Sequence, residues 1–245
     1  MKYVVIRDKE SKMKNIICLL TVVLLIIAFV GCSKDTKGSQ KDDSKSTTSS
    51  TNSEQDDNNH NEITVEDVEN AAVTEMSKFN YREVEDGIAI TSYNGEDEIV
   101  VIPDTIDGKK VVSIDNNSFV NNKTMLGLRL ADSIINIGSN AFENCTSLKV
   151  FVSGTSLMDI SEFAFNGCKE LRNVKLNEGL KSLGMLSFGA TNMSELYIPE
   201  SVETIDMPFT ANEGKALKII STSGSEAENY VSMDGENFNL TFEAK

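Results

Sequence analysis

The sequence is poor in the side chains that most catalytic centres use. Its 245 residues include no tryptophan, three prolines, four cysteines and one histidine. That histidine, His60, lies in a polar segment outside the part of the chain that we expect to fold. A Ser–His–Asp or Cys–His arrangement therefore cannot be assembled in the folded part. We predict a protein that is not an enzyme.

Positive charge is also scarce. Lys and Arg number 23 against 38 Asp and Glu, so the net charge is −15. Removing residues 1–31 as a signal takes away five basic and two acidic residues, which makes the charge −18. A negative field argues against nucleic acid as a partner and against adsorption on anionic lipid. The acidic clusters lack the spacing of a calcium-binding loop, and we expect no metal or cofactor.

The one long hydrophobic run lies near the N-terminus. Residues 14–32 read KNIICLLTVVLLIIAFVGC, a lysine followed by an apolar stretch that ends at Gly31-Cys32. This pattern is typical of a secretory signal. A cysteine at this place resembles the lipobox of bacterial lipoproteins, which implies that Cys32 is lipidated. A plain transmembrane anchor is the alternative, because the run has roughly spanning length. The chain's start, at Met1 or Met13, stays open.

Both interpretations place the rest of the chain outside the cell membrane. The lipoprotein resemblance implies a protein held at the extracellular face of a Gram-positive-like cytoplasmic membrane, or on the cell surface. Residues 33–62 contain no aliphatic or aromatic side chain. Such a segment cannot bury enough apolar surface to fold, so we expect a disordered tether with a reach of roughly 30 Å.

Apolar residues then recur at a nearly constant spacing. Isoleucine or leucine stands at positions 23, 23, 23 and 22 residues apart, and a phenylalanine follows each by five residues, or by four in the last unit. The first column is Ile114, Ile137, Ile160, Leu183 and Ile205; the second is Phe119, Phe142, Phe165, Phe188 and Phe209. Further columns are Met125, Leu148, Leu171, Met193 and Leu217, then Leu128, Phe151, Val174, Leu196 and Ile220.

This register predicts a solenoid. Segments such as Leu171-Arg-Asn-Val174-Lys-Leu176 alternate at their end as a strand does. One unit cannot enclose its own apolar side chains, so successive units stack and share a core. Parallel strands of successive coils would lie about 4.8 Å apart. Glycine and asparagine between the columns suit the corners: Gly138, Asn144, Asn166, Gly167 and Gly184.

Units of the form I-x-x-x-A-F-x-x-C-x-x-L-x-x-L-x-L resemble the BspA-like leucine-rich repeats of bacterial surface proteins. The resemblance runs from about Tyr81 to the C-terminus. It implies a β-rich, right-handed leucine-rich-repeat solenoid of the α/β superhelix class, with about five repeats of ~23 residues between two caps. It also implies a scaffold for surface adhesion and recognition.

The domain plan follows from these patterns. Residues 1–31 are the signal, and residues 32–62 are the lipidated cysteine and tether. Residues 63–110 form an N-terminal cap that begins with a short helix over residues 63–79, capped by Thr64 with Asp67 three residues on. Residues 111–222 are the repeats, and residues 223–245 are a C-terminal cap of a short helix and a strand.

Two cysteines, Cys145 and Cys168, fall at equivalent positions of adjacent units. A disulfide is geometrically conceivable because adjacent coils lie within its allowed Cα separation. Other units carry Asn122 and Thr191 at this position, so the two cysteines are also explained by a slot for small side chains that need not pair. Zinc would need two more ligands, and no histidine is at hand. Buried free thiols are our preferred interpretation, with the disulfide left open.

The candidate partner surface lies on the strands, between the apolar columns. One outward row runs Gly127, Val150, Asn173, Glu195 and Ile219; the next runs Arg129, Val152, Lys175, Tyr197 and Ser221. Arginine and tyrosine are enriched at binding hot spots. We therefore expect Arg129, Lys175 and Tyr197 to help hold a protein or glycan partner. An ordinary solvated strand face is the alternative interpretation of the same residues.

The sequence thus predicts a cell-surface lipoprotein whose solenoid is a non-catalytic binding or adhesion module. The ligand is an unidentified protein or glycan, and the lipid on Cys32 is the expected contact with the membrane. The alternatives are a structural envelope protein or an accessory subunit without a specific ligand of its own.

Overall fold

The structure is a computed structural model that describes residues 62–210 and 215–245. The predicted signal, Cys32 and the tether up to residue 61 lie outside the described residues. None of the helices within the described ranges is long and apolar enough to cross a membrane.

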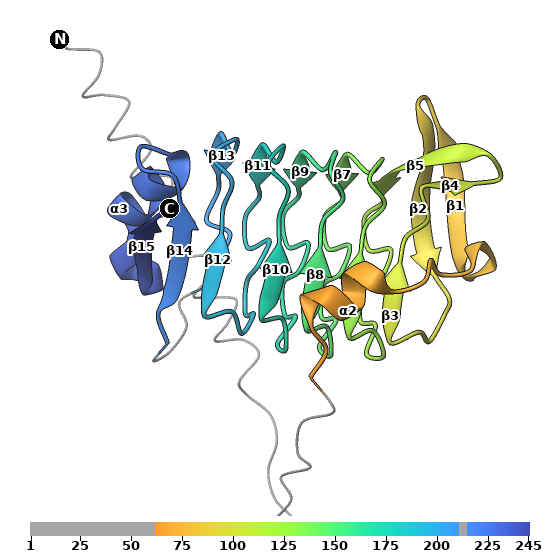
Figure 1. Ribbon diagram of the computed structural model, residues 1–245, viewed down its shortest axis with the longest axis horizontal. Coiled ribbons are helices and arrows are strands. Elements are labelled where there is room, and N and C mark those ends of the chain that lie inside the picture. Colours follow the sequence, from red (N-terminus) through yellow and green to blue (C-terminus); the bar gives the residue numbers. More distant parts are fainter. Residues whose placement is uncertain (1–61, 211–214) are drawn as a thin grey trace, which may run out of the picture. The chain divides into compact units, whose positions relative to one another are not determined.

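Short strands dominate the described chain (Figure 1). The helices are α2 (Val65–Asn70), the 3-10 helix η1 (Met76–Lys78) and α3 (Glu226–Phe238). The first strands are β1 (Phe79–Val84), β2 (Gly87–Tyr93), β3 (Ile99–Val101), β4 (Thr105–Ile106) and β5 (Lys109–Ile114). The repeats carry β6 (Gly127–Arg129), β7 (Asn136–Ile137), β8 (Val150–Val152), β9 (Asp159–Ile160), β10 (Asn173–Lys175), β11 (Ser182–Leu183), β12 (Glu195–Tyr197) and β13 (Thr204–Ile205). The last strands are β14 (Leu217–Ser221) and β15 (Leu240–Ala244).

These strands form ladders on two sides of a stack of coils. One ladder has the order β1-β2-β5-β7-β9-β11-β13, with β4 paired to β5. The other side carries β10-β8-β6-β3 and, as a separate ladder, β12-β14-β15. Pairing between successive coils is parallel, for example Asn136↔Asp159 and Leu128↔Phe151. The predicted leucine-rich-repeat solenoid is therefore confirmed, and Figure 1 shows its coils side by side.

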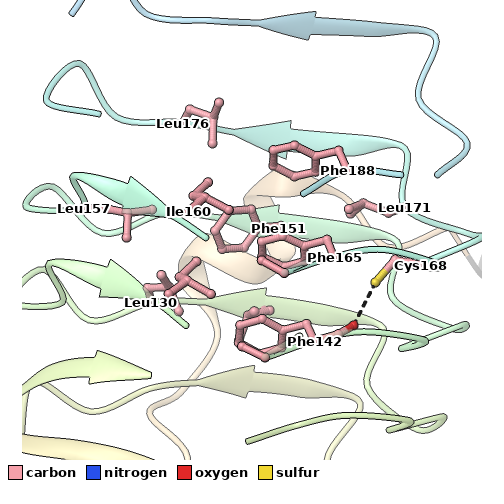
Figure 2. Close-up of a cluster of buried hydrophobic side chains, with 14 of the residues drawn as sticks. Leu130, Phe142, Phe151, Leu157, Ile160, Phe165, Cys168, Leu171, Leu176 and Phe188 are labelled. Atoms are coloured by element: carbon pink, nitrogen blue, oxygen red, sulfur yellow. Dashed lines mark hydrogen bonds between the residues drawn. The ribbon is translucent and has the colours of Figure 1, made fainter. Parts of the chain in front are cut away.

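A column of aromatic rings fills the core. Phe119, Phe142, Phe165 and Phe188 are at most 3 % exposed. Their rings stack from coil to coil with centroids 4.8, 5.0 and 5.3 Å apart. Phe151 packs on Phe165 from the strand side, with ring centroids 4.6 Å apart. Figure 2 shows these two rings next to each other. The aliphatic column of Ile114, Ile137, Ile160 and Leu183 is at most 1 % exposed.

Four successive coils use left-handed backbone at two corner positions each. These positions are Asn117 and Asn121, Asn140 and Asn144, Phe163 and Gly167, and Leu186 and Ala190, with φ between 50° and 76°. Gly138 and Gly184 serve another purpose, because a Cβ there would lie 2.7 Å from a backbone nitrogen of the preceding coil. These two glycines are therefore required at their corners by the close approach of the backbones and not by left-handed backbone.

The last coil differs from its predicted register. Leu217, Ile219 and Ser221 of β14 are buried, while Lys218 and Ile220 alternate outward. Glu195 accordingly pairs with Lys218, and Tyr197 with Ile220. The prediction that Ile220 fills the core and that Ile219 and Ser221 face outward is wrong, because β14 alternates strictly over five residues.

The C-terminal end is closed by helix α3 and strand β15. Ser225 caps α3 by accepting a hydrogen bond from the backbone N–H of Glu228, and Asn239 ends it with φ of 55°. Tyr230 of α3 packs on Phe209 with ring centroids 6.4 Å apart. Burial raises the pKa of the Tyr230 phenol. The apolar core of the last coil is thereby covered, as a solenoid end requires.

Candidate functional site

Helix α2 lies on the strand face that carries the predicted partner surface. Thr64 and Asp67 form the expected capping box, but the helix ends already at Asn70. Val68 is 0 % exposed because it packs on Val150 and Val152, which are 0 % and 5 % exposed. Ile63 and Val65 border the same contact. Figure 1 shows α2 crossing in front of this ladder.

Gly127 provides the space for this contact. A Cβ at position 127 would lie 2.5 Å from Val68 Cγ2 and 3.0 Å from Ile63 Cδ1. A larger residue would therefore clash with these two side chains unless they or the helix shift. The outward row formed by Gly127 and Val150 is thus covered by the chain's own segment 63–70 rather than open to solvent.

Polar contacts hold this segment at three places. Lys175 of β10 forms an ion pair with Glu69 of α2, and Arg172 Nη1 lies 2.8 Å from Glu62 Oε1. Thr74 binds the edge of β3: its N–H donates to the Val101 carbonyl at 3.1 Å, and its Oγ1 accepts from the Val101 N–H at 2.9 Å. The segment from Glu62 to Thr74 is therefore attached along the ladder from β10 to β3.

A groove of about 590 Å³ runs beside α2, over the ends of β6, β8 and β10. Its apolar lining comes from Leu130, Val152 and Leu176. The polar lining comes from Glu69, Arg129, Asp132, Ser153, Thr155, Lys175, Asn177 and Glu178. The structure therefore brings two of the predicted residues, Arg129 and Lys175, to one hollow.

Tyr197 lies next to this groove rather than in its lining. Its hydroxyl donates to Glu178, with 3.1 Å to Oε1, and Lys245 Nζ lies 4.3 Å from the centroid of its ring. Partial burial and then the Glu178 carboxylate raise the pKa of Tyr197. Backbone pairing also stops between β10 and β12, which belong to different ladders. Tyr197 is therefore connected to the groove by its hydrogen bond to Glu178, which belongs to the lining.

The two cysteines of the repeats are free and buried. Cys145 Sγ donates to the Phe119 carbonyl at 3.2 Å, and Cys168 Sγ donates to the Phe142 carbonyl at 3.1 Å. Figure 2 shows the second of these bonds, which joins one coil to the next. The hydrogen bond with Cys145 and then burial raise the pKa of the Cys168 thiol. Both thiols are 0 % exposed and act as packing groups.

Acidic side chains are spread over the surface. Within residues 62–210 and 215–245, no group of three or more His, Cys, Asp or Glu side chains could hold a metal ion. Asp97 is the best connected of the acids, since Lys78 Nζ lies 2.8 Å from its Oδ1 and Tyr93 donates to its Oδ2. These hydrogen bonds lower the pKa of Asp97.

The residues that the sequence reasoning missed are those of the covering segment. The sequence predicts a cap helix here but no surface for its apolar residues to pack on: Ile63, Val65 and Val68. The signal was present: a glycine and two valines occupy outward strand positions, where a solvated strand face favours polar residues. An apolar outward patch on one element and an apolar helix face elsewhere predict a contact between them.

Comparison with known proteins agrees with this architecture. The family described as "BspA type Leucine rich repeat region" matches residues 98–215 in six copies. The match begins ahead of residue 111, because β3 already pairs in parallel register with β6. No curated protein matches the sequence.

A solved structure shows the same fold. A leucine-rich repeat protein of T. pallidum superposes with a TM-score of 0.56 at 22% identity, over 71% of this chain and 84% of that one. A leucine-rich repeat protein of Bacteroides ovatus has a TM-score of 0.47 at 20% identity, over 69% of this chain and 51% of that one. The likeness to the T. pallidum protein shows the fold of this chain.

Proposed function

Because this chain is a BspA-like leucine-rich repeat protein, we propose that it acts at the bacterial cell surface as a non-catalytic binding and adhesion module. Its lipid anchor is Cys32, and its partner is a protein or a glycan that occupies the groove beside α2. Repeat arrays of this kind present an extended binding surface rather than a reaction centre. The structural envelope role is the competing possibility.

One observation carries the proposal. The groove beside α2 gathers Arg129 and Lys175 on one surface, with apolar side chains between the polar ones. A hollow that combines an apolar lining with a few convergent polar groups is the usual form of a ligand site. Tyr197 extends this surface by its hydrogen bond to Glu178.

The test measures capture of envelope and host-surface preparations by the full chain in detergent. The variant Arg129→Ala/Lys175→Ala/Tyr197→Ala removes the proposed contacts. A control variant, Arg82→Ala/Lys181→Ala/Tyr81→Ala, removes the same residue types from exposed positions on β1 and the loop before β11. We expect saturable capture that falls at least tenfold in the groove variant and stays unchanged in the control.

Equal capture by the two variants would contradict the assignment of the groove. Self-association of the chain with no saturable partner would favour the structural role. The anchor is tested separately by growth with a labelled fatty acid: we expect label on the natural chain and none on Cys32→Ala. Label that persists in Cys32→Ala would contradict the proposed lipidation.

A further inference from the structure

The charged side chains of the groove differ in whether they already have hydrogen-bond or ion-pair partners within the protein. Glu69 is paired with Lys175. Asp132 Oδ1 accepts the Thr155 backbone N–H at 3.0 Å. Glu178 accepts the Tyr197 hydroxyl at 3.1 Å. Each carboxylate of the groove is therefore engaged within the protein.

Arg129 is the exception. Among the described residues its guanidinium has no hydrogen-bond or ion-pair partner, and its Nε is fully buried. Arg172, on the loop that leads into β10, also has a buried Nε without a partner, but its terminal nitrogens are paired, at 2.8 Å from Glu62 and 3.4 Å from Glu170. A guanidinium presents five donors in a rigid fork that matches a carboxylate with two parallel hydrogen bonds. The free fork of Arg129 therefore fits an anionic group on a ligand.

The remainder of the groove narrows the ligand class. Ser153, Thr155 and Asn177 add short neutral polar groups beside Arg129. Asn177 is fixed in place, because its Nδ2 donates to the carbonyls of Thr155 and Leu157 at 3.1 Å. The volume of about 590 Å³ falls within the range of small-molecule sites.

We propose that this groove binds an oligosaccharide that carries a carboxylate group, with the carboxylate held by Arg129 and the sugar hydroxyls by the polar lining. This inference rests on the proposed function and names the ligand class for the same site. Lys175 supplies the second cation. Its pair with Glu69 is exposed to solvent, with 58 % and 38 % of the two side chains accessible, so the pair opens at little cost. Glu69 thus acts as an internal competitor for the ligand's acidic group.

The experiment titrates the full chain in detergent with trimers of galacturonic acid and of glucuronic acid. Neutral trimers of galactose and glucose with the same linkages are the matched ligands. We expect at least one acidic trimer to bind, and its neutral counterpart to bind at least tenfold more weakly. Arg129→Ala should lose at least tenfold in affinity, whereas Arg172→Ala should leave it unchanged. Glu69→Gln should tighten binding about threefold, because it frees Lys175.

The outcomes separate this inference from the proposed function. Binding of no acidic trimer, or equal binding of acidic and neutral trimers, overturns the carboxylate proposal. If a captured protein still depends on Arg129, Lys175 and Tyr197 in that case, the binding function stands and the ligand class is wrong. Binding of a peptide through its C-terminal carboxylate, with no acidic trimer bound, likewise overturns the sugar assignment. Arg129→Lys keeps the charge without the fork and should recover only part of the affinity.

Discussion

Substitution of Gly127 by alanine tests whether α2 is docked as the structure shows. The added Cβ would lie 2.5 Å from Val68 Cγ2, a separation that carbon atoms in contact do not adopt. Overpacking of this kind costs about 1–3 kcal/mol. Undocking of the helix exposes Val68, which is worth about 1.5–3 kcal/mol when fully buried. The two ranges overlap, so we expect Gly127→Ala to raise the fraction of molecules that release α2, against the remaining contacts of Ile63, Glu69 and Thr74.

The solenoid core should survive this release. Val68, Val150 and Val152 form a cluster separate from the aromatic core. The cost of Gly127→Ala to global stability is therefore limited to the free energy with which α2 docks. Hydrogen exchange followed by mass spectrometry should show lost protection over residues 63–74, with unchanged protection over the strands β7, β9 and β11.

A double-mutant cycle provides the control. Val68→Ala alone should weaken docking by about 2 kcal/mol, since it removes two buried methyl groups. It also removes the atom that a Cβ at position 127 would strike. The double variant Gly127→Ala/Val68→Ala should therefore be less destabilised than the sum of the two single variants. Strict additivity, or full protection of residues 63–74 in Gly127→Ala, would refute the contact between α2 and the sheet.

Three further predictions follow from the core, the corners and the ion pairs. Phe142→Ala should lower the free energy of unfolding by about 3–5 kcal/mol because it leaves a cavity in the ring stack. Cys145→Ala should lower it by about 1 kcal/mol. Equal losses in urea titrations under reducing conditions would contradict the packing role of the thiol. Ala190→Gly should raise the free energy of unfolding by about 1 kcal/mol, since Ala190 has φ of 50°. Gly167→Ala, at the equivalent corner, should lower the free energy of unfolding. A lower melting temperature for Ala190→Gly would contradict backbone strain at this corner. The lowered pKa of Asp97 means that its contribution to stability is present above the ordinary carboxyl pKa of 3.8 and is lost as the pH falls through the lower folded value; Asp97→Asn should therefore lower the melting temperature at neutral pH more than below pH ~3, and an equal effect at both would disprove the link.

The repeat pattern predicted the fold because one physical requirement recurs in every unit. Ile137, Phe142 and Leu148 must fill the same interior, so their spacing repeats for as long as coils stack. The spacing of the repeat does not predict the last coil. There β14 pairs with β15 across the C-terminal cap, and its five-residue alternation, rather than the spacing of the repeat, decides which side chains point inward.

The candidate site could be predicted only in part. Strand alternation placed Arg129 and Lys175 on one outward row, and the structure brings both to the groove. The position of α2 was not foreseeable from its own six residues, because docking depends on Gly127, which lies about 60 residues away in the sequence. The left-handed backbone at Phe163 and Leu186 was equally hidden, since neither residue type favours that conformation.

The central claim is that the groove beside α2 is the surface that meets the partner. The most direct measurement is hydrogen exchange of the full chain with and without a captured partner. The account predicts added protection at residues 129–132, 152–155 and 175–179, with no change at β1 and β2. Protection confined to β1 and β2, or to the ladder of β7, β9 and β11, would contradict it.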